Sequence, residues 1–472
     1  MITKIEIDGF KTFRRFEMEF SPLTVIAGTN ASGKSNLFDA LFLLSRIAET
    51  DLRTAFSEQR GTAAEQFTQY EEGAYATEMS FKVEVLLNKQ VQDNWGGRET
   101  LKYTRLSYEL SIRREVNEHG LEDLVISAEK LAALKHEDDG WVKKFLPAAT
   151  RADWRPKVST GRRQFPYIET DGTRAIILRQ DGSGGNKKEF AISSGLTQSI
   201  LSGIKYVDFR HAFALKEELV SWKFLQLNPQ ALREPTKQDI GMRDTITQTG
   251  ANLAAALWRI SLTDPYALKD ISRKLNRLLP SFVEVAVHND TANKQFIIKV
   301  KSEDGREFSS RVLSEGTLRL LALCIFQYDD LHTGLLCFEE PENGVHPARL
   351  KDMALLLSDL SVDFRDADGP LRQVIINTHS PILVSELFEL ERNPMTTVWL
   401  SQLVTSIIEE NGKKVRIYAS RLIPVDSDTK LEQNNQVRFN FPERKLALAQ
   451  LRNYLNHAKD VEKTIKELET NE

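Results

Sequence analysis

The segment from Gly28 to Ser35 reads GTNASGKS and constrains the chain more than any other feature. It fits the phosphate-binding pattern G-x-x-x-x-G-K-[ST] in full. A short apolar run from Leu23 to Ala27 precedes it, as expected of a buried strand, and a helix is predicted from about Ser35 to Ala48. Strand, glycine-containing loop and helix N-terminus together point backbone N–H groups at one anion, so the sequence predicts a loop that holds phosphates.

Two side chains of this loop supply chemistry that backbone amides lack. We expect Lys34 to reach the β and γ phosphates of ATP and the Ser35 hydroxyl to ligate Mg²⁺. Gly28 and Gly33 let the backbone N–H groups turn inward. ATP and Mg²⁺ are therefore the predicted cofactors.

A second candidate phosphate contact stands near the other end of the chain. Residues 313–317 read LSEGT, immediately before a helix predicted from about Gly316 to Phe326. The Ser314 hydroxyl and the Gly316 amide at a helix N-terminus suit a phosphate oxygen. Because Ser-x-Gly before a helix is also an ordinary helix cap, the motif alone leaves both interpretations open.

An apolar run from Leu335 to Phe338 leads into the acidic sequence EEPE. Carboxylates at the C-terminal end of a buried strand lie where open α/β folds bind ligands. We expect Glu339 to hold Mg²⁺, directly or through water, and Glu340 to orient and deprotonate the attacking water. A solvated acidic turn is the alternative.

His379 follows another apolar run, VIIN, about 40 residues after the two acids. An imidazole at a strand end can hydrogen-bond the γ-phosphate and the attacking water. A lone histidine is more often structural, but the position of His379 relative to the acids favours a functional role.

Composition limits the class of protein and its partners. The chain has 472 residues, enough for two or three domains, and 41% of them are hydrophobic. A net charge of -4 provides no global basic field for nucleic acid. Cys324 and Cys337 stand in apolar runs and are predicted to be core residues. Without a signal pattern or an 18-residue apolar run, we expect a cytoplasmic protein with no membrane contact.

Together, the four motifs resemble the ABC-type ATPases of the RecF, SMC, Rad50 and OLD group. That group combines a Walker A loop, an LSxG-type signature, a Walker B strand ending in acids, and a switch histidine. The sequence EEPENGVHP looks most like the AAA family ATPases of bacterial anti-phage defence systems, of the Septu and retron PtuA type. The opening IDGFKTF is similar to the IxNFKSF start of the group. The resemblance covers about residues 1–50 and 305–390.

The resemblance implies an α/β fold: an ABC-type ATPase head whose P-loop sheet is assembled from the N- and C-terminal halves, with an inserted mixed β and helical subdomain. Residues 1–50 would be the first half and 51–308 the insertion. Residues 309–425 would carry the signature, Walker B and the histidine, and 426–472 would be a helical tail.

Within these segments the patterns predict local structure. The first 27 residues look like a small β meander, and alternating runs in 78–115 predict antiparallel strands. Residues 117–195 look like loops between short elements. Residues 197–280 are predicted to be mainly helical, and a hairpin is predicted around residues 289–293.

In the resembling family, the signature serine lies across the nucleotide from the P-loop of a second subunit. Ser314 and Gly316 would therefore complete a partner's site, while the P-loop, both acids and His379 would act in their own chain. This implies an ATP-dependent head-to-tail homodimer or a higher homo-oligomer.

The resemblance also implies roles for residues near the loop. Asn30 and Asn36 would belong to the nucleotide site, and Lys11 would contact phosphate or adenine. A glutamine that senses Mg²⁺ is expected, and Gln66 and Gln69 are equal candidates.

The chain also departs from its relatives. It lacks sustained heptads and a Cys-x-x-Cys hook, so long-range DNA tethering is not expected. About 90 residues follow His379, too few for an appended Toprim nuclease, and Asp426 and Asp428 read as a loop turn. The resemblance to the Septu-type defence ATPases implies a regulatory ATPase that controls a separate effector nuclease in anti-phage defence, with the HNH type favoured. A RecF-like ATPase of DNA repair or recombination, without a dedicated nuclease, is the alternative.

Two further segments are candidate interaction surfaces. From Lys143 to Phe165 there are seven basic residues and one acid, with Trp154 among them. Such a segment can follow a nucleic-acid backbone, although a solvated loop or a docking surface for an acidic partner is the alternative. From Glu443 to Leu468, apolar residues at helical spacing predict a helix that packs on its own head or binds a partner.

Overall fold

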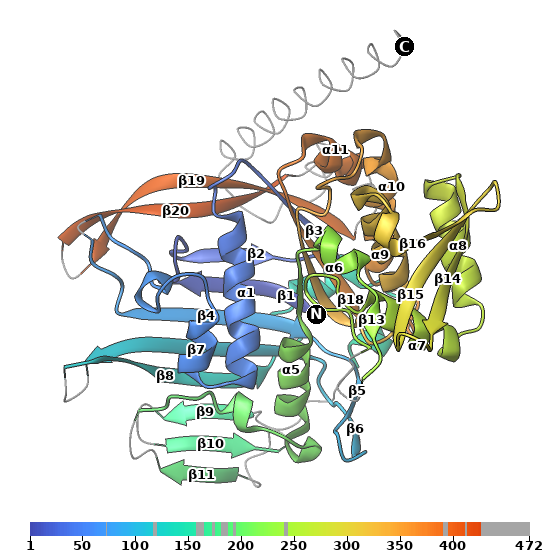
Figure 1. Ribbon diagram of the computed structural model, residues 1–472. Coiled ribbons are helices and arrows are strands. Elements are labelled where there is room, and N and C mark those ends of the chain that lie inside the picture. Colours follow the sequence, from blue (N-terminus) through green and yellow to red (C-terminus); the bar gives the residue numbers. More distant parts are fainter. Residues whose placement is uncertain are drawn as a thin grey trace.

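The computed structural model describes residues 1–71, 73–116, 120–156, 165–171, 175–180, 187–191, 195–239, 244–389, 395–410 and 413–425. The tail helix expected over 443–468 and the Asp426–Asp428 turn lie outside these residues. Figure 1 shows helix α1 (Lys34–Glu49) running across the strands of a large antiparallel sheet.

A six-stranded sheet positions the site. Its order is β12–β17–β18–β3–β19–β20, and all neighbouring strands are parallel except β19 and β20. Strand β3, which leads into the P-loop, lies between β18 and β19 from the other end of the chain. The expected α/β head, with its P-loop sheet assembled from both halves, is therefore confirmed. The strands are β3 (Leu23–Ala27), β12 (Lys223–Leu225), β17 (Gly334–Glu339), β18 (Arg372–Thr378), β19 (Thr396–Glu410) and β20 (Lys413–Val425).

Both faces of this sheet are covered, which is why every residue of its central strands β3 and β18 is buried. On one face, Ile26 shares a core with Leu41 of α1 and Phe81 of the antiparallel sheet. On the other, Val374 shares a core with Leu318 of α9. The covering helices are α1 and α5 (Arg210–Ser221) on the first face, and α9 (Glu315–Gln327), α10 (Leu350–Leu360) and α11 (Pro381–Glu389) on the second.

The antiparallel sheet has eight strands in the order β11–β10–β9–β8–β7–β4–β1–β2. It is continuous across residue 50, because β4 pairs with both β1 and β7. The strands predicted within 78–115 are confirmed as β4 and β7. The strands are β1 (Ile2–Asp8), β2 (Phe16–Glu19), β4 (Glu78–Leu86), β7 (Arg105–Val116), β8 (Glu122–Ala133), β9 (Ile168–Asp171), β10 (Ala175–Arg179) and β11 (Lys187–Ala191).

Two sequence expectations about strands were wrong. β1 and β2 pair as predicted, but β3 leaves the expected meander and joins the six-stranded sheet. β8 is a strand of 12 residues in a region expected to consist of loops between short elements. Its register with β7 shifts between Ser111 and Ile112, and this irregularity together with charged residues such as Glu129 obscures the two-residue period.

The remaining elements flank these sheets. The predicted hairpin is confirmed as β14 (Phe282–Asp290) and β15 (Gln295–Ser302). Cys324 and Cys337 are buried, as expected of core residues. No helix among the described residues has the length and apolar character needed to cross a membrane. The other elements include α2 (Leu52–Ser57), α3 (Gly140–Phe145), α4 (Arg151–Trp154), α6 (Pro229–Arg233), α7 (Leu253–Thr263), α8 (Ala267–Leu278), β5 (Gln90–Gln92), β6 (Arg98–Thr100), β13 (Thr236–Lys237) and β16 (Glu307–Ser309).

Candidate active site

The loop between β3 and α1 requires glycine at two places. Gly28 has a φ of 150° and Gly33, the N-cap of α1, has a φ of 92°. A Cβ at Gly33 would lie 1.8 Å from Ser420 Oγ, and a Cβ at Gly28 would lie 2.7 Å from the carbonyl oxygen of Ser401. Both the backbone conformation and the close approach of β19 and β20 therefore exclude side chains here.

Serines of the β19–β20 hairpin hold this loop in place. Ser401 Oγ donates a 2.9 Å hydrogen bond to the carbonyl of Ser32, and Ser420 Oγ donates to the same carbonyl at 3.3 Å. Ser420 Oγ also lies 2.6 Å from Thr12 Oγ1, which accepts a 2.7 Å bond from Asn36. Sequence patterns did not indicate the two hairpin serines, because their role depends on a long-range contact.

Lys34 folds back over the loop. Its Nζ donates to the carbonyl oxygens of Gly28 at 2.7 Å and Thr29 at 2.8 Å. Burial lowers the pKa of the ammonium group, and the carboxylates of the EEPE segment oppose that shift. Because a phosphate forms stronger charge-assisted hydrogen bonds than a carbonyl, this ammonium is well placed to exchange its present partners for an anion.

The residues expected to hold Mg²⁺ meet beyond the ends of β3 and β17. Ser35 Oγ donates a 3.0 Å hydrogen bond to Glu339 Oε1, and Asn377 Nδ2 lies 3.5 Å from Ser35 Oγ. The Oδ1 atom of Asn377 is buried and has no hydrogen-bond partner among the described residues. A set of oxygen donors with a free buried acceptor fits Mg²⁺ and its water ligands. Asn377 was not singled out from the sequence, although its place at the end of an apolar strand was a signal.

Glu340 follows β17 with a φ of 48°, a left-handed conformation that is uncommon outside glycine. Its Oε1 lies 2.9 Å from Nδ1 of His379, and its Oε2 accepts a 2.9 Å bond from Asn343 Nδ2. The Glu340 backbone N–H donates to the carbonyl of Asn377 at 2.8 Å. The structure therefore brings together the two residues expected to act on water, and it adds Asn343, which the sequence did not indicate.

Ser314 caps α9, one of the two interpretations that the sequence left open, and Gly316 lies in the first turn of that helix. Ser314 is the N-cap of α9, and its Oγ accepts a 3.3 Å bond from the backbone of Thr317. A Cβ at Gly316 would lie 2.8 Å from the carbonyl oxygen of Gly344. Within the described part of the chain, no hydrogen bond or ion pair joins either residue to its own P-loop.

Lys11 lies beside the loop, in a row of charged side chains that continues through Asp39 and Arg60. Its Nζ lies 2.7 Å from Asp39 Oδ2 on α1. Arg60, two-thirds exposed, lies 3.6 Å from Asp39 and 3.7 Å from Glu339. Arg60 was not identified from the sequence, because an exposed arginine in an irregular segment carries no local signal.

The other expected loop contacts differ in their surroundings. Asn30 is exposed at the loop surface, whereas Asn36 is hydrogen-bonded to Thr12. Gln66 is buried, and its Nε2 donates to the carbonyl of Arg60 at 2.7 Å, while Gln69 is exposed. Gln66 therefore supports the Arg60 turn, and neither glutamine hydrogen-bonds to the Mg²⁺ residues within the described part of the chain.

The basic segment at 143–165 is only partly an open surface. Trp154 is buried, and its Nε1 donates to the carbonyl of Phe364 at 3.1 Å, so it does not offer a ring for base stacking. Arg155 is also buried and pairs with Asp139 at 2.8 Å. Its basic residues at 157, 162 and 163 lie outside the described residues. The described part therefore serves mainly to join α3 and α4 to the body.

Two family models match the chain. One, described as "AAA domain, putative AbiEii toxin, Type IV TA system", matches residues 194–385. The other, an AAA ATPase domain, matches residues 1–148. Between them they include the P-loop, the acidic segment and His379. No curated protein matches the chain.

Solved structures that resemble the chain include SMC head domains. One SMC head, bound to the C-terminal winged-helix domain of ScpA, is 13% identical with a TM-score of 0.46, and the match covers 91% of this chain and 99% of that one. The SMC head domain from Thermotoga maritima is 12% identical with a TM-score of 0.36, over 90% of this chain and 99% of that one.

Two stretches of the chain, which between them hold the P-loop, the acidic segment and His379, are thus similar to AAA ATPase domains. The P-loop sheet draws strands from both halves of the sequence, the arrangement expected of an ABC-type ATPase head.

Proposed function

We propose that the protein binds Mg²⁺–ATP at the loop after β3 and hydrolyses it to ADP and phosphate. The observation that carries this proposal is the convergence of the Ser35–Glu339 pair and the Glu340–His379 pair at one edge of the sheet. Lys34 would leave two carbonyls to bind the β and γ phosphates. Bound Mg²⁺ would supply charge neutralisation at the phosphates, and Ser35 and Glu339 would hold it.

Glu340 is the proposed general base. It would accept a proton from water as the water oxygen bonds to the γ-phosphorus and the bond from that phosphorus to ADP breaks. His379 would orient Glu340 and contact the γ-phosphate, and Asn343 would hold the other carboxylate oxygen. The left-handed backbone at Glu340 turns the side chain toward these partners.

The test compares two variants that fail at different steps. Lys34→Ala should lose ATP binding, whereas Glu340→Gln should bind ATP and hydrolyse it about 10²–10⁴-fold more slowly, the range for loss of a general base. ATP binding and phosphate release are measured separately. Wild-type turnover in Glu340→Gln would remove Glu340 from the base role.

We also propose that Ser314 and Gly316 complete the site of a second subunit in a head-to-tail homodimer. Both stand at the N-terminus of α9, where free backbone N–H groups favour an anion. Ser314→Arg and Lys34→Ala should each be inactive alone. Mixed, they should recover about a quarter of wild-type activity, since half of randomly paired dimers are mixed and each then holds one intact site. No recovery from a confirmed mixed dimer would contradict the shared site.

For the biological role, we infer that this ATPase controls a separate effector nuclease, of the HNH type, in anti-phage defence. One matching family is described in terms of a toxin of a type IV toxin–antitoxin system, which favours a role in such a conflict system. Affinity purification with all neighbouring genes present tests this. A stoichiometric nuclease whose association changes in Glu340→Gln would support the role. An ATP-dependent homodimer that binds DNA and carries no nuclease would favour the RecF-like alternative.

A further inference from the structure

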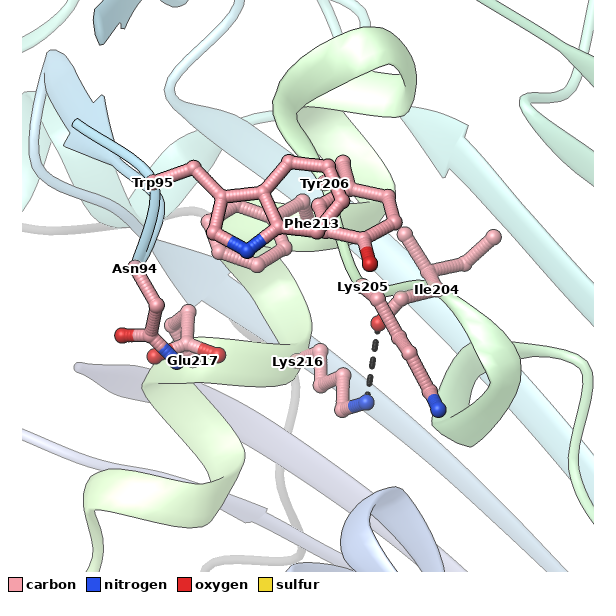
Figure 2. Close-up of a pocket in the computed structure, with 8 residues that line it drawn as sticks. All are labelled: Asn94, Trp95, Ile204, Lys205, Tyr206, Phe213, Lys216 and Glu217. Atoms are coloured by element: carbon pink, nitrogen blue, oxygen red, sulfur yellow. Dashed lines mark hydrogen bonds between the residues drawn. The ribbon is translucent and has the colours of Figure 1, made fainter. Parts of the chain in front are cut away.

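A cavity of about 230 Å³ lies between the β5–β6 turn and helix α5. Figure 2 shows aromatic rings and two lysine side chains around it. None of its lining residues belongs to the proposed ATPase site. The cavity is smaller than the roughly 300–1,000 Å³ of sites for drug-sized ligands, so it can enclose one planar ring system, and the rest of a larger ligand would extend beyond it.

Trp95 supplies the main aromatic surface. The turn that carries it is closed by Asp93, whose Oδ1 accepts from the backbone N–H groups of Trp95 at 3.0 Å and Gly97 at 2.8 Å. The Trp95 ring contacts that of Tyr206 at an interplanar angle of 31°, with centroids 4.0 Å apart, yet the residue remains 77% exposed. Because the turn holds Trp95 and its indole ring remains exposed, a ligand can stack on the ring without a large loss of side-chain entropy.

Two lysines and one acid, Glu217, line the cavity, so its formal charge is positive. Lys216 donates to the carbonyls of Ser202 at 2.6 Å and Ile204 at 2.8 Å, and so holds the segment that presents Tyr206. Lys205 is exposed and has no ion pair or hydrogen bond among the described residues. Both ammonium groups disfavour a cation against the rings. An aromatic ligand that carries a negative charge satisfies both features.

We propose that this cavity binds one nucleotide, with its base stacked on Trp95 and its phosphate at Lys205. Base stacking on an aromatic side chain next to a basic group is the chemistry of nucleic-acid sites that lack sequence preference. The nucleotide is either free or one unit of a single strand, because both present the same base and phosphate.

This site is separate from the ATPase site. α5 packs along α1. Burial lowers the pKa of the Lys216 ammonium group, and Glu49, at the C-terminal end of α1, is close enough to that group to raise the pKa against this effect. The P-loop lies at the other end of this 16-residue helix, a distance of about 24 Å at 1.5 Å per residue. Occupancy of the cavity therefore does not require occupancy of the P-loop.

The experiment measures binding of AMP, UMP and a fluorescein-labelled single-stranded oligonucleotide to the full chain. Monophosphates are used because they lack the β and γ phosphates that the P-loop holds. Trp95→Ala should weaken binding about tenfold or more, as expected for loss of one base–aromatic stack. Lys205→Glu should weaken it further and reduce its salt dependence.

Matched controls are Tyr266→Ala, at an aromatic residue that is 70% exposed beside α8, and Lys351→Glu on α10. Neither should change the affinity. Binding of monophosphates that depends on Trp95 would establish a free-nucleotide site, and binding of the oligonucleotide alone would establish a single-strand site. No binding of any probe, or equal weakening in the Tyr266 control, would overturn the proposal. The ATPase activity of Lys34→Ala is measured in a separate experiment. A negative result for binding at the cavity would therefore not contradict the proposed ATPase function.

Discussion

The hydroxyl of Ser35 donates a 3.0 Å hydrogen bond to Glu339, although 304 positions separate the two residues in the chain. The bond forms because β3 and β17 both flank β18 in one parallel sheet. The C-terminal ends of parallel strands open at the same edge, which is where α/β sheets bind ligands.

Removal of the Ser35 hydroxyl should weaken Mg²⁺ binding. In Ser35→Ala we expect the Mg²⁺ concentration for half-maximal ATPase activity to rise at least about tenfold, because an oxygen ligand is lost. A Mg²⁺ titration of ATPase activity measures this. Ser57→Ala, at an exposed position in α2, is the control and should match the wild type. An unchanged Mg²⁺ requirement in Ser35→Ala would remove Ser35 from the metal site.

Asn343 should act by positioning Glu340. Loss of its 2.9 Å hydrogen bond to a carboxylate should lower kcat by about one to two orders of magnitude in Asn343→Ala, given about 1.5–3 kcal/mol for bonds to charged groups. KM for ATP should hardly change, because Asn343 has no role in holding the nucleotide. Steady-state kinetics separate the two constants. Asn293→Ala, in the β14–β15 turn, is the control, and a rise in KM alone would contradict the positioning role.

Two glycines with similar backbone angles should respond differently to alanine. A Cβ added at Gly33 would lie 2.8 Å from Ser420 Cβ, so rotation of the serine hydroxyl cannot relieve the overlap. A Cβ added at Gly73 would point into open space. Gly73→Ala should cost only the left-handed strain, about 1–2 kcal/mol. Gly33→Ala should cost more and abolish ATP binding. Urea unfolding measures both, and equal losses would refute the contact argument.

Glu129 should make stability depend on pH. This buried carboxyl accepts from Tyr108 and from the backbone N–H groups of Ile200 and Leu201, yet burial raises its pKa to about 7 from 4.5. The folded state therefore binds the proton more tightly than the unfolded chain. The corresponding stability is fully present below pH 4.5 and is lost as the pH rises through 7, by about 3 kcal/mol at most.

Urea unfolding between pH 5 and 8 tests this dependence. In Glu129→Gln the decrease in unfolding free energy across that range should become smaller, whatever the absolute stability of the variant. Glu115→Gln, at an exposed position in β7, should keep the wild-type slope. An unaltered slope in Glu129→Gln would mean that other groups set the pH dependence.

Much of the site was predictable because its chemistry is local in sequence. The P-loop glycines, Lys34 and Ser35 stand in one segment, and an apolar strand before Glu339 places the acids at a sheet edge. The long strand β8 was missed because Glu129 and a register shift interrupt its alternation. The position of β3 was also missed, since an apolar strand does not reveal which sheet it joins.

The sequence by itself determined the phosphate loop, the paired acids and the buried strands that carry them, because each depends on residues close together in the chain. Only the tertiary structure decided that Asn377 meets Ser35, that Arg60 lies beside Glu339, and that Ser420 closes on Gly33. These contacts depend on how distant strands and helices pack against one another, and local propensity carries no record of that packing.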